Sequence, residues 1–212
     1  MYRKFGKRWL DVVCSGLLLV ILSPMLLMIA VLVRCKLGSP VFFKQTRPGK
    51  NEQMFDIIKF RTMINAFDAS GEPLPDKERV TRFGMFLRTS SLDELPELWC
   101  ILRGDMSFVG PRPLSKLYLP YYTEREAVRH CVRPGLTGLA QINGRNALGW
   151  DERLALDVEY VDTLSFMNDM RIIWKTVLKV LRKDDVILAG TGSVGDLDEI
   201  RDVQRPKYLD KT

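Results

Sequence analysis

Histidine is almost absent from the 212-residue sequence, and its four cysteines form no C-x-x-C pair. The single histidine, His130, argues against a zinc site and excludes a Ser-His-Asp relay unless His130 itself serves it. The cysteines are expected to be free thiols in a reducing compartment. A Walker A lysine motif is absent, which argues against an ordinary NTPase. Zinc-finger, helix-turn-helix and RNP patterns are absent too, so nucleic acid is not the expected partner.

The charge balance is basic, with a formal net charge of +6 and an isoelectric point of about 9.2. A basic protein favours an anionic partner, such as nucleic acid, phospholipid or a phosphorylated substrate. Because the sequence also contains a long apolar run, we expect anionic lipid and substrate phosphates to be the partners.

The apolar run lies near the N-terminus, where residues 12–33 carry no charge. Its length suffices to span a bilayer core and is too great for a cleaved signal peptide. Ser23-Pro24 lies in the middle of the run, and the proline ring clashes with the carbonyl of Val20, so the helix must kink or break. We expect the Ser23 hydroxyl to help satisfy the freed carbonyl.

Basic residues flank the run on both sides, which favours a cytoplasmic location for both ends. They are Arg3, Lys4, Lys7 and Arg8 before the run and Arg34 and Lys36 after it. A helix that enters the bilayer, breaks at Ser23-Pro24 and returns satisfies both features. From the residues alone, a kinked transmembrane helix is an equal alternative.

The rest of the chain predicts a single, mostly helical cytosolic domain with a small β-hairpin, of the α+β (α/β) class. Residues 41–46 and 54–63 predict two strands joined by a turn. Apolar spacing predicts helices at 82–89, 92–102, 114–130, 150–165 and 170–183, and residues 135–144 predict a strand and a turn. We expect three parts: a membrane helix at 1–38, the domain at 39–183 and a loose C-terminal tail at 184–212.

The predicted helix at 170–183 is amphipathic, with Trp174 and Val177 on its apolar face and basic residues over much of the remainder. Such a helix could lie along an anionic membrane surface. The alternative is a basic face exposed to solvent.

A glycine-rich stretch at 190–195 matches G-x-G-x-x-G. A dinucleotide-binding fold also needs a following helix, another strand and an acidic residue about twenty positions on. We therefore expect a flexible loop here instead.

Adjacent carboxylates occur in the stretch Ser91-Leu92-Asp93-Glu94-Leu95-Pro96 and allow two structural interpretations. Ser91 and Glu94 fit an S-x-x-E capping box at the start of a helix. Alternatively, the helix begins at Pro96 and leaves Asp93 and Glu94 on an exposed turn before it. In a catalytic interpretation, one carboxylate binds Mg2+ and the other attacks phosphorus.

A phosphate site also needs cations, and the basic residues of this chain occur in short stretches punctuated by proline and glycine. Arg112 is the most distinctive, because Pro111 and Pro113 fix the backbone on both sides and preset the direction of its guanidinium. The candidate substrate-binding residues are Lys59, Arg61, Arg88, Pro111, Arg112, Pro113, Arg133, Gln141, Asn143 and Arg145.

Taken together, the motifs resemble the small monotopic phosphoglycosyl transferases of the bacterial sugar transferase family, over nearly the whole chain. The resemblance is carried by Ser23-Pro24, KFRTM at 59–63, SLDELP at 91–96, RGDMSFVGPRP at 103–113, RPGLTG at 133–138 and NGRN at 143–146. The stretch NGRNALGW at 143–150 is most similar to the PglC-like subgroup, whose members start bacterial protein N-glycans.

The resemblance implies a re-entrant helix broken at Ser23-Pro24 and monotopic anchoring at the cytoplasmic face of the bacterial inner membrane. It also implies that Asp93 attacks the β-phosphate of a UDP-sugar and releases UMP, after which undecaprenyl phosphate takes the sugar phosphate from the enzyme. Asp93 and Glu94 are the implied catalytic pair and Mg2+ ligands. Arg88 and Arg112 match phosphate- and nucleotide-binding positions, and the subgroup suggests UDP-N,N'-diacetylbacillosamine as the donor.

Two other functions use the same features. A Mg2+-dependent nucleotide-sugar hydrolase would turn over without a lipid acceptor. A membrane-anchored scaffold would bind anionic lipid and release no UMP. The sequence leaves the sugar, the downstream pathway and the oligomeric state open.

Overall fold

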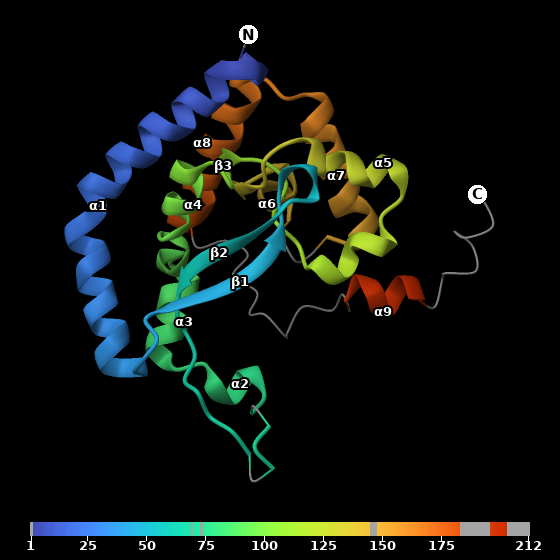
Figure 1. Cartoon of the computed structure of the whole chain (residues 1–212). Coiled ribbons are helices and arrows are strands. Elements are labelled where there is room, and N and C mark those ends of the chain that lie inside the picture. The colour runs from blue at the N-terminus through green and yellow to red at the C-terminus, as the bar shows by residue number, and fades with distance from the viewer. Residues whose placement is uncertain (1, 69, 73, 145–147, 183–195, 203–212) are drawn as a thin grey trace.

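The computed structural model describes residues 2–68, 70–72, 74–144, 148–182 and 196–202, and Figure 1 shows how the elements are arranged. The helices are α1 (Lys7–Leu37), α2 (Asp76–Arg79), α3 (Arg82–Thr89), α4 (Glu97–Arg103), α5 (Glu124–Ala127), α6 (Leu139–Asn143), α7 (Trp150–Asp162), α8 (Phe166–Arg182) and α9 (Leu197–Asp202). The strands are β1 (Phe42–Pro48), β2 (Met54–Phe60), β3 (Ser107–Val109) and β4 (Gly135–Thr137). Short helical turns are η1 (Tyr2–Gly6), η2 (Lys50–Glu52), η3 (Leu92–Glu94), η4 (Lys116–Tyr121) and η5 (Val128–Cys131).

The predicted hairpin is confirmed, although its second strand ends at Phe60 and not at residue 63. β1 and β2 pair antiparallel, with Phe42 opposite Phe60 and Pro48 opposite Met54. In the turn, Asn51 has a φ of 53°, a left-handed conformation that asparagine tolerates better than most residues. The strand β2 buries Ile57 against α4, so the hairpin covers the helix that follows the adjacent carboxylates.

A second, parallel pair of strands forms the centre of the domain. β3 pairs with β4 through Ser107–Gly135 and Val109–Thr137. The two chains approach so closely beyond the pair that a Cβ atom on Gly135 would lie 2.1 Å from the backbone nitrogen of Gly110. Only glycine permits this approach, which fixes where the loop after β3 begins.

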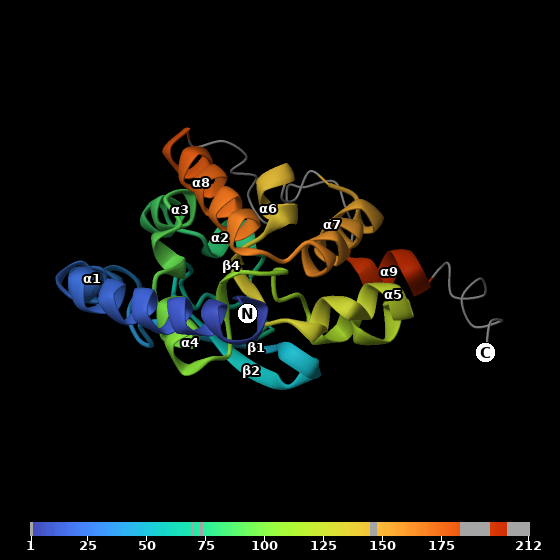
Figure 2. The same cartoon turned by 90° about the horizontal axis from the view of Figure 1, so that it is seen from above.

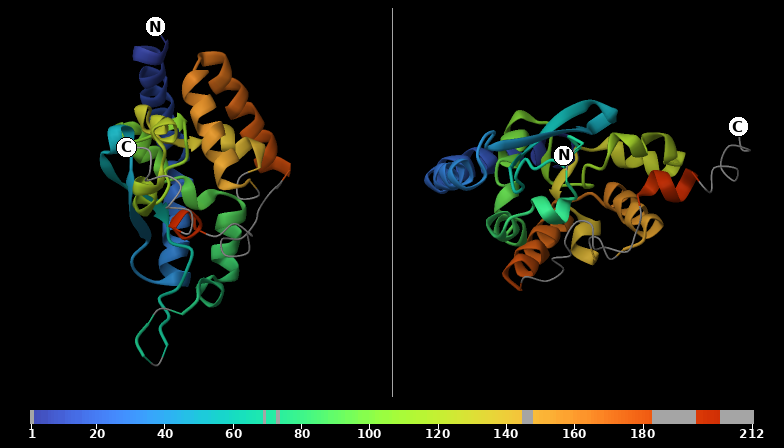
Figure 3. Two further views of the ribbon diagram at one scale, coloured as in Figure 1. Left: turned by 90° about the vertical axis from the view of Figure 1, so that its right-hand side faces the viewer. Right: turned by 90° about the horizontal axis from the view of Figure 1, so that it is seen from below.

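The elements surround this central pair on three sides. The β1–β2 hairpin lies on one side, and helices α6, α7 and α8 lie on the other (Figures 2 and 3). The long helix α1 runs along a third flank and contacts α4. The α+β class predicted from the sequence is therefore confirmed.

Helix α1 is unbroken in its backbone assignment through Pro24, but it bends midway along its length (Figure 1). The Ser23 hydroxyl donates a 2.8 Å hydrogen bond to the carbonyl of Val20, as expected for the group that proline deprives of a partner. Among the described residues, Tyr2–Leu37 is the one helical segment long and apolar enough to cross a membrane.

Both ends of α1 are attached to the domain. Near its start, the Arg8 guanidinium donates to the carbonyls of Ile101 and Leu102 at 2.6 and 2.7 Å. These carbonyls lie in the last turn of α4, beyond which no further helical turn supplies donors. Near its end, Val33 and Leu37 are buried in a cluster with residues of β2 and α3. The outward face between these contacts exposes apolar side chains, which are Leu17, Val20, Ile21, Leu27, Met28 and Val31.

The predicted helix at 114–130 is wrong. The structure has η4, α5 and η5 in its place, because Pro120 interrupts the pattern and Thr123 starts a new helix. The Thr123 hydroxyl accepts a hydrogen bond from the backbone of Glu126, whose carboxylate accepts one from the backbone of Thr123. This reciprocal capping box fixes the start of α5.

The expectation of a loose tail is also wrong for the part that the structure describes. Leu197 of α9 is fully buried with Leu114, Tyr118 and Leu154. Arg201 contacts both carboxylate oxygens of Glu126 at 2.7 and 2.8 Å. Arg201 also pairs with Asp151 at 2.7 Å, so a buried leucine and the ion pairs of one arginine dock α9 onto the domain. The many charges of this segment concealed that combination. The G-x-G-x-x-G stretch at 190–195 lies outside the described residues.

Candidate active site

Asp93 and Glu94 lie on the short turn η3 between α3 and α4. Ser91, which precedes the turn, has φ 55° and ψ 18°, and its side chain caps no backbone group. The helix α4 begins at Glu97, directly after Pro96. The capping-box interpretation is therefore wrong, and the alternative is confirmed for the start of the helix, although Asp93 and Glu94 are half-buried and not exposed. A left-handed serine is an uncommon, strained conformation that holds the two carboxylates on a sharp turn.

Glu94 is held by two cations that come from different elements. Its Oε1 atom lies 2.6 Å from Lys59 Nζ, near the end of β2, and 2.9 Å from Arg112 Nη2, in the loop after β3. Burial raises the pKa of Glu94, but Arg112 and Lys59 outweigh burial and lower it to about 2. Glu94 is consequently a permanent anion at neutral pH.

Lys59 is shared with a second, more deeply buried carboxylate that the sequence interpretation missed. Glu97, whose side chain is 3% exposed, has its Oε1 atom 3.1 Å from Lys59 Nζ. Burial and the nearby negative charge of Glu94 raise the pKa of Glu97 to about 7. The available signal was its position four residues after Asp93, but a glutamate in the first turn of a helix is ordinary.

Asp93 has an environment different from that of Glu94. Burial and the negative charge of Glu94 raise the pKa of Asp93 to about 6, although Lys59, Arg88 and Arg112 offset part of that effect. When the environment moves the pKa values of two adjacent carboxylates in opposite directions, the two groups usually have different chemical roles. Asp93 is the more basic of the two and is still mostly ionised at neutral pH, as a carboxylate nucleophile requires.

Arg88 is the third cation that acts on Asp93, and it belongs to α3. Its Nε atom donates a 2.9 Å hydrogen bond to the Thr62 hydroxyl, which orients the guanidinium from beyond the end of β2. Three of the predicted cations, Lys59, Arg88 and Arg112, are thus gathered around the carboxylates. Together they form a site with the charge pattern expected for binding a diphosphate.

The sequence of this chain is similar to those of known proteins. A family model described as bacterial sugar transferase matches residues 2–183. The chain belongs to the bacterial sugar transferase family. Its membership makes the protein an enzyme that transfers a sugar-bearing group.

Several relatives cover most of the transferase. The sugar transferase EpsL of Bacillus subtilis is 50% identical over 85% of this chain and 89% of the relative. The UDP-glucose:undecaprenyl-phosphate glucose-1-phosphate transferase of Caulobacter vibrioides is 40% identical over 84% of this chain and 71% of the relative. The undecaprenyl-phosphate galactose phosphotransferase of Salmonella typhimurium is 36% identical over 85% of this chain, which spans 41% of that longer relative.

The remaining predicted site residues are not gathered at the carboxylates by any contact among the described residues. Arg61 donates to the carbonyls of Leu37 and Ser39, so it holds the C-terminal end of α1. Arg133 donates to the carbonyl of Gly104 at 2.7 Å, at the end of α4. Both arginines therefore have structural contacts that the sequence pattern did not distinguish from substrate contacts.

The side-chain amides of α6 donate to nearby backbone carbonyls. The Gln141 amide donates to the carbonyl of Leu136 at 3.3 Å, and Asn143 donates to that of Leu139 at 2.9 Å. Gln141 is buried and Asn143 is exposed. Arg145 lies outside the described residues, so its predicted role stays a prediction.

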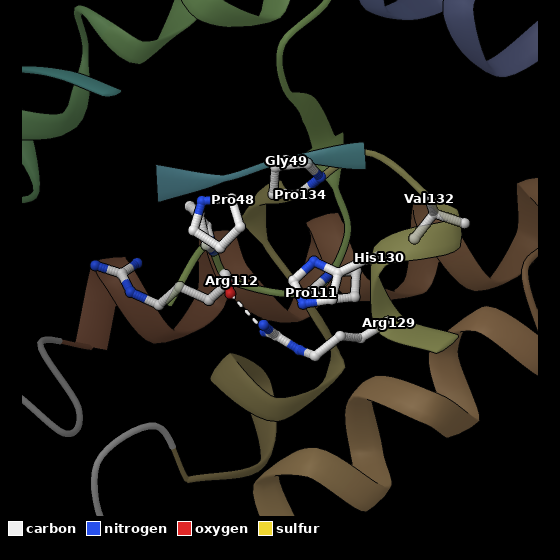
Figure 4. Close-up of a pocket in the computed structure, with 9 residues that line it drawn as sticks. Pro48, Gly49, Pro111, Arg112, Arg129, His130, Val132 and Pro134 are labelled. Carbon is white, nitrogen blue, oxygen red and sulfur yellow. Dashed lines mark hydrogen bonds between the residues drawn. The ribbon is translucent and has the colours of Figure 1, made fainter. Parts of the chain in front are cut away.

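The loop Pro111-Arg112-Pro113 places the Arg112 side chain toward Glu94 and its backbone toward the interior. Beside that backbone lies a cavity of about 10 Å³, room for about one water molecule, lined by Pro111, Arg112, Arg129 and His130 among others (Figure 4). The side chain of Arg112 extends in the opposite direction from its carbonyl oxygen. The Arg112 guanidinium thus contacts Glu94 on the side away from this cavity.

The donor set of the turn fits Mg2+. Among the described residues, no group of three or more His, Cys, Asp or Glu side chains is arranged to hold a metal ion. Asp93 and Glu94 offer two carboxylates, and Mg2+ is usually held by one or two carboxylates while substrate phosphates and water complete its shell. Two carboxylates are within the number that Mg2+ uses, and the ion itself stays a prediction.

Proposed function

We propose that the protein transfers a sugar 1-phosphate from a UDP-sugar to undecaprenyl phosphate, with UMP as the other product. The relatives support the general reaction, since one is a UDP-glucose:undecaprenyl-phosphate glucose-1-phosphate transferase and another an undecaprenyl-phosphate galactose phosphotransferase. The observation that carries the proposal is the pair Asp93 and Glu94, with Lys59 and Arg112 fixed on Glu94.

In the first step, the ionised Asp93 carboxylate attacks the β-phosphorus of the UDP-sugar. A bond forms between the carboxylate oxygen and that phosphorus, the bond to the bridging oxygen of the diphosphate breaks, and UMP leaves with the bonding electrons. In the second step, an oxygen of undecaprenyl phosphate attacks the same phosphorus and releases Asp93. The aspartate is thus regenerated, and the sugar phosphate ends on the lipid through a new diphosphate bond.

Charge repulsion is the main barrier to both steps, because two anions must approach an anionic carboxylate. Arg88 and Arg112 have the fork geometry that binds phosphate oxygens, and each can offset part of this repulsion. Lys59 keeps Glu94 oriented and so prevents it from competing with Asp93 as nucleophile. Asp93 and Glu94 would hold Mg2+, which supplies positive charge at the diphosphate when it is bound.

The placement at a membrane is part of the proposal. We infer monotopic anchoring of α1 at the cytoplasmic face of the bacterial inner membrane, as a re-entrant helix. The support is that both ends of α1 contact the domain while its outer face is apolar, whereas a spanning helix would leave one end on the far side of the bilayer. The α8 helix adds an exposed apolar face with Trp174, 64% exposed, as expected of an interfacial helix.

Product analysis tests the reaction directly. We expect UMP from the purified protein with a UDP-sugar, Mg2+ and undecaprenyl phosphate, and labelling of the protein by a donor that carries a tagged β-phosphate. Asp93→Asn should abolish the labelling, because an amide does not attack phosphorus. Full labelling of that variant would remove Asp93 as the nucleophile.

The same assay separates the rival functions and the sugars. A hydrolase would release UMP and free sugar phosphate without acceptor, and a scaffold would release no UMP. Release of UDP would mean transfer of the sugar alone. The donor panel should include UDP-N,N'-diacetylbacillosamine, which the sequence suggests, together with UDP-glucose and UDP-galactose, which correspond to the relatives' names.

A further inference from the structure

The peptide bonds around Arg112 offer few places where the protein can hold them. Pro111 and Pro113 have no N–H group, so the peptide before Pro111 and the peptide between Arg112 and Pro113 cannot be held through a backbone donor. The peptide between Arg112 and Pro113 can therefore be held only through the carbonyl oxygen of Arg112. The carbonyl of Pro111 accepts a 2.9 Å hydrogen bond from the backbone of Gly135.

The carbonyl of Arg112 is held by a buried guanidinium. Arg129 Nη2 donates to it at 2.6 Å, as the dashed line in Figure 4 marks. Arg129 is 3% exposed and also donates to Asp157 Oδ2 from Nε at 3.0 Å and from Nη2 at 2.8 Å. Asp157 of α7 is 2% exposed. The guanidinium therefore has a fixed orientation, set by α7, at the point where it meets the loop.

Helix α7 also holds the N-terminal end of the segment from Val109 to Arg112. The Tyr160 hydroxyl, fully buried, contacts the carbonyl of Val109 at 2.9 Å. Asp157 and Tyr160 are three residues apart, so they lie on one face of α7. Helix α7 thus determines where the segment from Val109 to Arg112 lies, although none of its side chains is among the contacts of the two carboxylates on η3.

A buried ion pair is a poor device for stability alone. Desolvation of both charges offsets most of their attraction, and apolar residues of similar volume often serve the packing as well or better. What this pair does provide is geometry. It directs the Arg129 guanidinium at the carbonyl of Arg112, and the guanidinium of Arg112 in turn binds Glu94.

We propose that Arg129 and Asp157 are positioning residues, which fix the Arg112 backbone so that its guanidinium points at Glu94 and at the phosphates of the donor. This role rests on the proposed function for its catalytic consequence. Neither residue touches the substrate in this scheme. A displacement of Arg112 by about 1 Å should lower kcat/KM by about ten- to a hundredfold.

The test is a double-mutant cycle with Arg129→Lys and Arg112→Ala. Lysine can reach Asp157 or the carbonyl but does not reproduce the fork that reaches both. We expect Arg129→Lys to lower kcat/KM about ten- to a hundredfold in the wild-type background and to have no effect when Arg112 is already alanine. Arg125→Lys is the matched control, because Arg125 pairs with Asp162 on the exposed surface and should change nothing.

A second variant guards against loss of folding. Arg129→Met with Asp157→Leu replaces the pair by apolar side chains, which should keep the fold while leaving the Arg112 carbonyl unheld. We expect the same loss of kcat/KM, again absent in the Arg112→Ala background. Equal losses in both backgrounds, or wild-type activity in this folded variant, would overturn the positioning role.

A readout without turnover separates this proposal from the proposed function. If the wild-type protein transfers no sugar phosphate, the proposed function fails. The mobility of the Arg112 guanidinium can still be measured by the 15N relaxation of its Nε–H resonance. That resonance is identified by its loss in Arg112→Ala. We expect a rigid Arg112 in the wild-type protein and a mobile one in the Arg129→Met, Asp157→Leu variant. Equal rigidity in both would refute the positioning role.

Discussion

Replacing Glu97 by glutamine should stabilise the protein more at pH 8 than at pH 5. The Glu97 side chain is 3% exposed and shares Lys59 with Glu94. Burial, followed by the charge of Glu94, raises the pKa of Glu97 from its ordinary 4.5 to about 7, although Lys59 and Arg112 lower it in part. Glutamine has the same shape and no proton to lose, so it removes the cost of ionisation without opening a cavity.

The sign and size follow from linkage. Because the folded-state pKa lies above the unfolded value, the folded protein binds the proton more tightly, and this contribution to stability is lost as pH rises from about 4.5 through 7. The full window corresponds to about 3 kcal/mol, most of which falls between pH 5 and pH 8. For a chain of this length, the advantage of the variant in Tm should grow by about 5–10 °C over that interval.

The assay is thermal unfolding of wild type and Glu97→Gln in the same detergent at pH 5, 6, 7 and 8. Glu159→Gln is the matched control, since Glu159 lies on the exposed side of α7 and stays in contact with water. A difference in Tm that is constant across pH, or that shrinks as pH rises, would show that Glu97 is already ionised beside Lys59 in the folded protein and would refute the reasoning.

Two further predictions concern the nucleophile and the membrane helix. The pKa of Asp93 is raised to about 6, so its ionised fraction should rise about tenfold from pH 5 to pH 7. The single-turnover rate of protein labelling should rise by the same factor and then level off. A rate that does not vary from pH 5 to pH 8 would contradict this. Replacing Ser23-Pro24 by Ala-Ala should favour a straight, spanning α1, so a cysteine placed by Tyr2→Cys should move to the other side of the membrane in an accessibility assay. An unchanged side would contradict the re-entrant arrangement.

Local chemistry explains which parts of the fold could be predicted. The hairpin was predictable because β-branched and aromatic runs flank a turn, and α3 and α8 because their apolar spacing is regular over the whole element. The segment 114–130 was mispredicted because Pro120 and the Thr123 cap override an apolar pattern that seemed continuous. The docking of α9 depends on Glu126, about 75 residues away along the chain, which no local pattern reveals.

The candidate site divides in the same way. Arg112 was predictable because an arginine between two prolines is unusual in itself. Asp93 and Glu94 stood out through the resemblance to the family, since adjacent acidic residues also occur at 151–152, 184–185 and 198–199. The roles of Arg61 and Arg133 were not, since an arginine that binds backbone carbonyls has the same local sequence as one that binds phosphate. Arg129 and Asp157 are 28 residues apart and became a pair only when α7 packed against η5.

The way α1 is attached has a practical consequence for anyone who wants a soluble fragment. Asp11, 4% exposed, accepts hydrogen bonds from the Ser107 hydroxyl and the backbone of Phe108, and Val33 is fully enclosed beside Phe60. Deleting residues 1–38 would leave β3 without its acceptor and open an apolar cluster to water. Helix α1 is therefore an integral part of the folded domain. Protein for kinetics should retain α1 and be kept in detergent or lipid.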